Sequence, residues 1–173
     1  KWVVGNAHKL ELPSIIEINE SLVLTPKMTK ESFTLPGNSI DRHHTRANLK
    51  VQDGCDFYCS FCVIPFARGP ARSRQFDDIL KEARELVHSG HRELVITGVN
   101  IATYSDQDFS FFDIIKSLEA IPKLDRIRIS SIEPTTIPYE LIDHMATSPK
   151  LCRHLHIPIQ SATDSVLNLM ARK

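Results

Sequence analysis

The sequence lacks any long hydrophobic run. None of its apolar stretches approaches the roughly 18 to 20 residues that a membrane-spanning helix needs, and its first residues lack the charged and then apolar layout of a signal peptide. Positive charge is not in excess either, because 21 Lys and Arg residues balance 21 Asp and Glu residues. The sequence therefore excludes a protein that holds nucleic acid by net charge alone, and we expect a cytoplasmic protein with no membrane partner.

Cysteine is scarce, with only four residues in the chain. Three of them, Cys55, Cys59 and Cys62, lie in one loop at C-x3-C-x2-C spacing, whereas Cys152 is isolated in an apolar stretch. This distribution excludes a disulfide framework. We interpret the clustered thiols as metal ligands and Cys152 as a small core residue.

The chain of 173 residues has 42% apolar and 24% charged residues, which is typical of a globular protein of about one domain. Residues 1–19 predict a short strand and helix, the carboxy-terminal remnant of an α/β domain. Residues 20–45 shift to Ser, Thr, Pro and Asn and predict a linker that pairs one short strand. Residues 46–173 form the main predicted domain.

Short apolar strands alternate with helices in this main domain. Strands are expected at 46–52, 94–97, 126–130 and 154–159, and helices at 77–89, from 111 after a Ser110 cap, at 138–145, and from 166. This order predicts right-handed βαβ units and a parallel sheet. The fold class is therefore α/β, and because four units do not close an ordinary barrel, we expect part of a larger (β/α) barrel.

Polar residues follow each expected strand. In parallel α/β sheets, ligands bind at the carboxyl ends of the strands. The cysteine loop follows the first strand, and the later strands are followed by Gly98 and Asn100, by Ser131 and Glu133, and by Gln160. One such residue is usually only a turn former or a cap. Four polar clusters at one rim predict a ligand site.

The three clustered thiols are compatible with more than one kind of metal site. A four-iron cluster with three thiolate ligands keeps one iron free for a non-protein ligand. The alternatives are a zinc site completed by His43 or His44, and a ferredoxin-type cluster with a fourth cysteine. Zinc sites usually come as paired C-x2-C half-sites, and Cys152 lies at the start of a strand, away from the loop.

Aromatic and basic residues surround the cysteines. Phe57, Tyr58 and Phe61 interleave them and predict an apolar shell that limits solvent. The segments on both sides of the loop, 42–50 and 66–74, carry basic residues and no acidic ones. In the second segment, Arg72 and Arg74 are candidates for pairing with a carboxylate or an RNA phosphate, although either side chain could simply face water.

The cysteine loop, together with residues 63–69 and the sequence Arg72-Ser73-Arg74, resembles the radical S-adenosylmethionine (SAM) enzymes, and specifically their methylthiotransferase branch. The resemblance runs from residues 3–7, similar to the end of the family's amino-terminal domain, to residues 156–161. Residues 97–101 and 128–134 are most similar to the bacterial enzymes that modify threonylcarbamoyladenosine beside the tRNA anticodon.

The resemblance implies a tRNA methylthiotransferase that converts threonylcarbamoyladenosine in the anticodon loop to its 2-methylthio derivative. A [4Fe-4S] cluster on the three clustered cysteines would bind SAM through its open iron. The implied SAM contacts are Phe61, Gly98, Asn100, Ser131, Glu133 and Gln160, and the implied substrate contacts are Arg72 and Arg74.

The same resemblance implies partners that the chain does not contain. They are a second [4Fe-4S] cluster in an amino-terminal domain, a tRNA-binding domain, and an electron donor such as flavodoxin or ferredoxin. We therefore expect the isolated chain to be inactive. The alternatives are a methylthiotransferase for isopentenyladenosine or a ribosomal protein, another radical SAM reaction, and a non-catalytic module that binds zinc or RNA.

Overall fold

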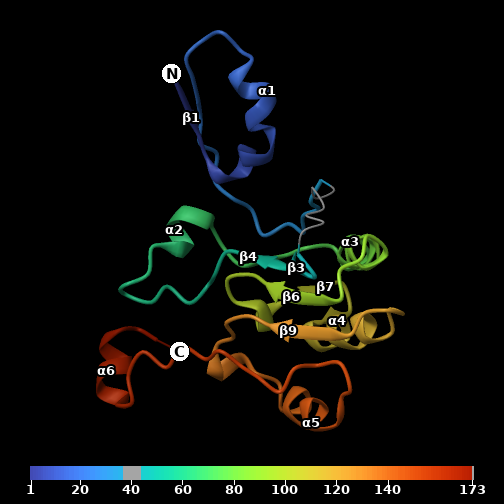
Figure 1. Ribbon diagram of the computed structural model, residues 1–173. Coiled ribbons are helices and arrows are strands. Elements are labelled where there is room, and N and C mark those ends of the chain that lie inside the picture. The colour runs from blue at the N-terminus through green and yellow to red at the C-terminus, as the bar shows by residue number, and fades with distance from the viewer. Residues whose placement is uncertain (37–43, 173) are drawn as a thin grey trace.

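The computed structural model describes residues 1–36 and 44–172 (Figure 1). His43, one of the two histidines considered for zinc, lies outside the described residues. At the amino terminus, strand β1 (Trp2–Val4) leads into a short 3-10 helix (Asn6–Glu11) and helix α1 (Leu12–Ile16). Strand β2 (Leu22–Leu24) pairs parallel with β1. The expected early strand and helix, and a short strand in the following segment, are thus present, whereas the domain boundary stays a prediction.

A parallel sheet forms the centre of the main domain. Its strand order is β3 (Arg46–Lys50), β6 (Glu93–Thr97) and β9 (Arg126–Ile129). The register pairs Lys50 with Thr97 and Ile96 with Ile129, so the carboxyl ends of all these strands lie at one edge. This confirms the predicted α/β class and places the loops that follow the strands side by side.

Helices α3 (Phe76–His88) and α4 (Phe111–Glu119) connect these strands and pack against the sheet (Figure 1). Their apolar stripes meet the strands in a core where Leu49, Ile79, Ile96, Ile114 and Ile127 have no exposed surface. The Ser110 hydroxyl accepts from the Asp113 N–H, which confirms the predicted cap. No helix of the described residues is long and apolar enough to cross a bilayer.

The cysteine loop projects from the sheet, and two short paired strands join its ends. Strand β4 (Gln52–Asp53) pairs antiparallel with β5 (Arg72–Ser73), and helix α2 (Ile64–Arg68) lies within the loop. Gly54 has a φ of 73°, and a Cβ atom there would lie 2.0 Å from the Pro70 carbonyl oxygen. Only glycine fits this position. The sequence did not predict α2 or the β4–β5 pair.

The predicted fourth strand at 154–159 is wrong. Among the described residues, the returning segment forms two isolated bridges on this side of the sheet, Ile127 of β9 with Leu151 and, beyond the end of β9, Ser131 with His156. The four residue steps from Ile127 to Ser131 therefore face five steps from Leu151 to His156, so the returning segment bulges and no continuous ladder forms. Helices α5 (Tyr139–Thr147) and α6 (Asp164–Leu169) flank this irregular segment.

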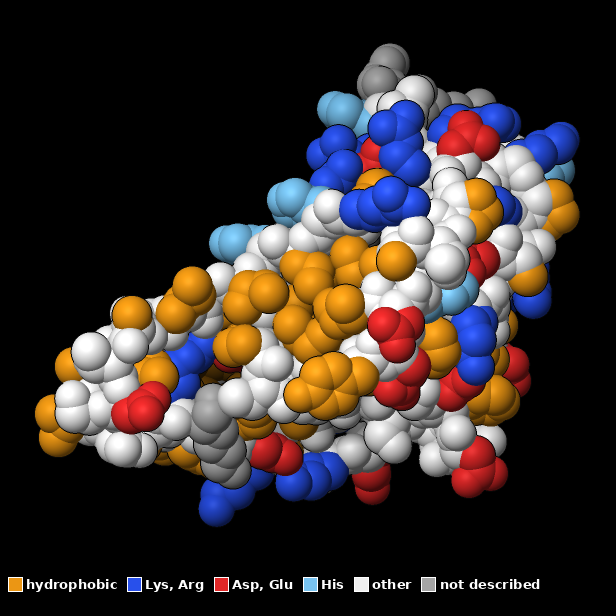
Figure 2. Space-filling view, turned by 90° about the horizontal axis from the view of Figure 1, so that it is seen from below, with side chains coloured by type: hydrophobic (Ala, Val, Ile, Leu, Met, Phe, Trp, Pro, Cys, Tyr) orange, Lys and Arg blue, Asp and Glu red, His pale blue; other side chains and the backbone are white. Residues whose placement is uncertain are grey.

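An apolar surface covers the side of the molecule formed by these last elements. Figure 2 shows apolar side chains gathered on the face seen from below. Tyr139, Leu169 and Ile159 are among the most exposed large hydrophobic residues, at 90%, 83% and 65%. A hollow of about 360 Å³ lies there between α5 and residues 153–155. This face has the character of a contact surface.

Arg74 belongs to the interior, so its predicted role as a substrate contact is corrected. It is 1% exposed. Its guanidinium pairs with Asp78 at 2.6 Å and with Glu82, and donates to the Lys50 carbonyl at 3.2 Å. Both carboxylates project from α3, so this group ties the helix to β3. The enclosed guanidinium cannot also reach an RNA phosphate.

Replacement of Arg74 by Met should lower the free energy of unfolding by about 3 to 5 kcal/mol, because it leaves Asp78 and Glu82 without their buried cation. Urea denaturation measures this. The matched control is Arg84→Met, on the exposed part of the same helix, which should change stability by no more than about 0.5 kcal/mol. Equal losses in the two variants would contradict the interior role of Arg74.

Gln52 joins two loops at the edge of the sheet. The side chain is fully buried. Its Oε1 accepts from the backbone N–H groups of Val99 and Asn100, each at 2.9 Å, and its Nε2 donates to the carbonyls of Asp53 and Gly54 at 3.0 and 2.8 Å. One amide thereby connects the start of the cysteine loop to the turn after β6.

Replacement of Gln52 by Leu should lower the free energy of unfolding by about 2 kcal/mol or more, because two backbone N–H groups lose their acceptor. Amide hydrogen exchange should accelerate at Val99 and Asn100 in particular. Gln75→Leu, at an exposed position, is the control and should leave both measurements near wild type. Unchanged exchange at Val99 and Asn100 in the Gln52 variant would show that the connection is not needed.

Candidate functional site

The three clustered cysteines lie in the loop that follows β4, beyond the carboxyl end of β3. Cys59 is buried, and Cys55 and Cys62 are half-buried. Burial raises the pKa of the Cys55 thiol, and the neighbouring Cys59 and Cys62 add to the effect. No three His, Cys, Asp or Glu side chains of the described residues are grouped so as to hold a metal ion. Thiol sulfur is a soft ligand of the kind that iron–sulfur clusters use.

Cys152 is separate from these thiols and from the core. It is half-buried, which corrects the prediction of a core residue, because it lies on the irregular segment outside β9. Its N–H donates to the carbonyl of Ile127, near the amino end of that strand. The structure thus places Cys152 at the opposite end of the sheet from the cysteine loop.

The aromatic residues of the loop face partly outward. Tyr58 and Phe61 are each 53% exposed, and Tyr58 makes an edge contact with Phe66 at a ring distance of 5.9 Å. Tyr58 also adopts a left-handed backbone, with a φ of 49°. The apolar shell predicted from the sequence is therefore open on its outer side.

The turn after β6 meets the cysteine loop. Asn100 is 1% exposed, and its Nδ2 has no hydrogen-bond acceptor of ordinary geometry within the described part of the chain. The same amide lies near enough to lower the pKa of Cys55, against the larger effect of burial. A buried donor without an acceptor is costly unless a ligand supplies one. The position therefore fits an anionic or carbonyl group beside the cysteines.

The same turn has no room for a side chain at Gly98. A Cβ atom there would lie 2.7 Å from Ile101 Cγ2 and 3.0 Å from the Gln52 carbonyl oxygen. The absence of a side chain lets the backbone approach both the cysteine-loop base and any ligand above it. Gly98 and Asn100, which sequence analysis selected as SAM contacts, are thus brought to the cysteine loop.

The polar residues after β9 lie on the far side of Asn100. The Thr136 hydroxyl is 3.4 Å from Asn100 Oδ1. Ser131 hydrogen-bonds His156 at 2.9 Å, and Glu133 pairs with Arg172 at 2.5 Å. Both polar groups therefore already have protein partners that the sequence did not predict.

The carboxy-terminal segment contacts the cysteine loop. The N–H of Ser60 donates to the carbonyl of Met170 at 2.9 Å. Arg172, 5% exposed at its side chain, also donates to the Pro158 carbonyl at 2.5 Å. Gln160, in contrast, is exposed with a left-handed φ of 64°. Gln160 is therefore, like Phe61, a predicted site residue that the structure leaves exposed.

A charged centre that the sequence did not predict lies at the base of the loop. Asp53 is fully buried, and among the described residues it pairs with Lys9, Lys50, Arg68 and Arg72 at 2.9 to 3.4 Å. Burial alone would raise the pKa of Asp53, but the hydrogen bond and charge of Lys50, with Arg68 and Lys9, hold it well below its usual range. Only the spatial meeting of distant residues reveals this centre.

Arg72 faces this centre instead of open solvent. Its side chain is 15% exposed, pairs with Asp53 at 3.4 Å and lies over the Phe33 ring at 4.7 Å. The arginine is therefore engaged within the protein. It has less freedom to bind a substrate than its place in a polar loop suggested.

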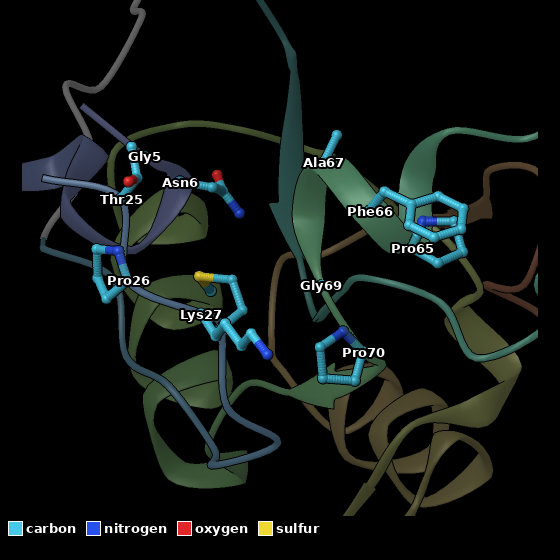
Figure 3. Close-up of a pocket in the computed structure, with 11 residues that line it drawn as sticks. Gly5, Asn6, Thr25, Pro26, Lys27, Pro65, Phe66, Ala67, Gly69 and Pro70 are labelled. Atoms are coloured by element: carbon cyan, nitrogen blue, oxygen red, sulfur yellow. The ribbon is translucent and has the colours of Figure 1, made fainter. Parts of the chain in front are cut away.

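Two of the cavities that adjoin these residues border the cysteine loop or the turn after β6. One, of about 500 Å³, is lined by Lys50, Ile64, Arg68 and the residues 97–99. The other, of about 390 Å³, lies between residues 5–28 and residues 65–70, and Figure 3 shows Asn6 and Lys27 on one side of it and Phe66 on the other. The first cavity shares its wall with the turn that carries Asn100.

Sequence comparison relates the chain to bacterial proteins. It is 44% identical over 132 residues to the threonylcarbamoyladenosine tRNA methylthiotransferase MtaB of Bacillus subtilis, covering 75% of this chain and 29% of that protein. A Chlamydia pneumoniae protein of the same name is 42% identical and covers 92% of this chain and 38% of that protein. The tRNA-2-methylthio-N(6)-dimethylallyladenosine synthase of Pelagibacter ubique is 43% identical, with 72% and 29% covered. The chain thus spans about a third of the length of these relatives.

Structure comparison adds a fold neighbour. The radical S-adenosylmethionine methyltransferase TsrM of Kitasatospora setae, solved with cobalamin and a [4Fe-4S] cluster, aligns with a TM-score of 0.56 and 17% identity, over 81% of this chain and 29% of that chain. Residues 49–173, which include the whole cysteine loop and all the strand-end residues described above, match the radical SAM superfamily. The chain belongs to that superfamily and forms part of its fold.

Proposed function

We propose that this chain is the catalytic core of a tRNA methylthiotransferase that acts on threonylcarbamoyladenosine next to the anticodon. The observation that carries the proposal is the buried Asn100 amide, which lies against the Cys55 thiol at the start of the cysteine loop. The names of the relatives at 42 to 44% identity support the substrate class. A cytoplasmic location is expected for an enzyme of tRNA.

In this proposal Cys55, Cys59 and Cys62 would hold a [4Fe-4S] cluster, and Asn100 would contact SAM. When bound, the cluster would supply the electron for the reductive cleavage of SAM. Gly98 allows the backbone to approach the amino-acid end of SAM, and the Asn100 Nδ2 donates to it. The turn is held in place by Gln52.

The other predicted site residues contact SAM or position the loop around it. Ser131 and Glu133 are oriented by His156 and Arg172 and can offer oxygen atoms to ribose hydroxyls. Phe61 and Gln160 are exposed and can contact the substrate side of SAM. Arg72 and Asp53 position the loop base, so their effect on substrate is indirect.

The reaction needs groups beyond these residues. Insertion of sulfur into the adenine ring requires a sulfur source, which we assign to a second [4Fe-4S] cluster in an amino-terminal domain. Reduction requires an electron donor such as flavodoxin or ferredoxin. We therefore expect no methylthiolation by residues 1–173 alone.

The second candidate is the same reaction on isopentenyladenosine. Its support is the 43% identity to a tRNA-2-methylthio-N(6)-dimethylallyladenosine synthase, since dimethylallyl and isopentenyl denote the same substituent. The similarity of residues 97–101 and 128–134 to the threonylcarbamoyladenosine enzymes favours the first candidate.

Anaerobic reconstitution with iron and sulfide should give about four irons for this site, and Cys55→Ala, Cys59→Ala or Cys62→Ala should remove most of them with the visible absorbance. Cys152→Ala is the matched control and should keep both. A Cys152 variant that loses as much iron as the other variants would contradict the assignment, and tightly bound zinc after anaerobic purification would favour a non-catalytic module.

The full-length enzyme, reduced and supplied with SAM, should convert threonylcarbamoyladenosine in tRNA to its 2-methylthio derivative, detected by mass spectrometry of digested nucleosides. Asn100→Leu should slow the reaction by about 10-fold or more, because the SAM contact is lost. Conversion of isopentenyladenosine tRNA with no conversion of threonylcarbamoyladenosine tRNA would overturn the first candidate in favour of the second.

A further inference from the structure

The cavity beside the cysteine loop has a cationic wall. It is lined by Lys50 at the end of β3, by Ile64 and Arg68 of α2, and by residues 97–99 after β6, and measures about 500 Å³. The Lys50 and Arg68 side chains line the cavity and are 26% and 43% exposed. Among the described residues lining this cavity, no acidic side chain is present.

The carboxylate of Asp53 does not balance the positive charge of this wall. The described residues place Lys9, Lys50, Arg68 and Arg72 around the single carboxylate of Asp53, at distances of 2.9 to 3.4 Å. One carboxylate cannot neutralise so many cations, which repel one another at this spacing. A second anion, arriving from the cavity side, would relieve that repulsion.

The cavity also lies at the reaction region. Its wall includes Gly98 and Val99, and the next residue, Asn100, reaches the Cys55 thiol. The N–H groups of Val99 and Asn100 are held by Gln52, so the spacing between the cavity and the cysteines is fixed. An anion bound in the cavity would belong to a molecule that reacts at the cysteine loop or lies beside it.

We propose that this cavity binds the carboxylate of the threonylcarbamoyl group on the target adenosine, through Lys50 and Arg68, and so selects that substrate over one with a neutral isopentenyl group. The inference rests on the proposed function and names its specificity determinant. A threonyl carboxylate can accept charge-assisted hydrogen bonds from both cations. An isopentenyl group would displace water from these cations without supplying an acceptor in its place.

SAM is a second source of a carboxylate for this cavity, because its methionine part carries one. Loss of a contact to SAM and loss of a contact to the substrate have different effects on binding. Loss of a SAM contact weakens SAM binding on every RNA, whereas loss of a substrate contact weakens binding only of RNA whose modified base carries a carboxylate. The experiment therefore measures both ligands.

The test uses the full-length enzyme with its clusters reconstituted. The probes are anticodon stem-loop RNAs carrying threonylcarbamoyladenosine, its neutral methyl ester, or isopentenyladenosine, and the readouts are the Kd of each RNA and the Kd of SAM. The variants are Lys50→Met and Arg68→Met. Lys9→Met is the matched control, because Lys9 also pairs with Asp53 but does not line the cavity.

Wild type should bind the carboxylate RNA about 10- to 100-fold more tightly than the methyl ester RNA, the range expected for hydrogen bonds to a charged group. Lys50→Met and Arg68→Met should each lose most of this preference and keep the SAM Kd. Lys9→Met should keep the preference to within about 2-fold, as expected for a partly exposed ion pair. The wild-type comparison needs no variant, so it holds even if a substitution disturbs folding.

Equal affinity of wild type for the acid and the ester would overturn the proposal, and so would variants that weaken SAM binding but keep the preference. A uniform loss across all three RNAs would also overturn it, since that is the signature of a phosphate contact. Failure of the proposed function shows differently, as absent methylthiolation by wild type on every RNA, whatever the measured preference.

Discussion

The hydrogen bonds of the buried Gln52 side chain are the interaction on which the rest of the site depends. Loops at the ends of parallel strands leave backbone groups without ladder partners, and here one side-chain amide supplies an acceptor to Val99 and Asn100 and donors to Asp53 and Gly54. The cysteine loop and the turn after β6 are therefore held as one unit. The positions of Asn100 and of the cationic cavity relative to the thiols follow from this connection.

The cysteine loop contains two regions of different electrostatic character, the thiols and the cations around Asp53. Burial raises the pKa of Cys55, so its thiolate calls for a cationic partner, whereas the lysines and arginines around Asp53 call for a further anion. The uncharged Asn100 amide stands near the thiols and contributes a donor without adding charge. This separation gives the region a thiol-rich end and a cationic end.

One side of the site is closed by the chain and another is left uncovered. The Ser60–Met170 and Glu133–Arg172 contacts return the carboxy-terminal segment to the cysteine loop. Among the described residues, the outer side of β9 and the turn after it carry two isolated bridges, and the apolar surface around α5 and α6 is exposed (Figure 2). The chain spans about a third of the length of its relatives.

The sequence by itself determined the local features, because they depend on neighbouring residues: the cysteine spacing, the apolar stripes of α3 and α4, the Ser110 cap and the α/β order. It also indicated that Gly98 and Asn100 belong with the cysteines, through the rule that strand ends share an edge. Tertiary structure alone decided that Arg74 is buried between two carboxylates, that 154–159 bulges away from β9, and that cations from four segments meet at Asp53. These outcomes depend on contacts between residues far apart in the chain, and no spacing or periodicity records which charged side chain will find its partner inside.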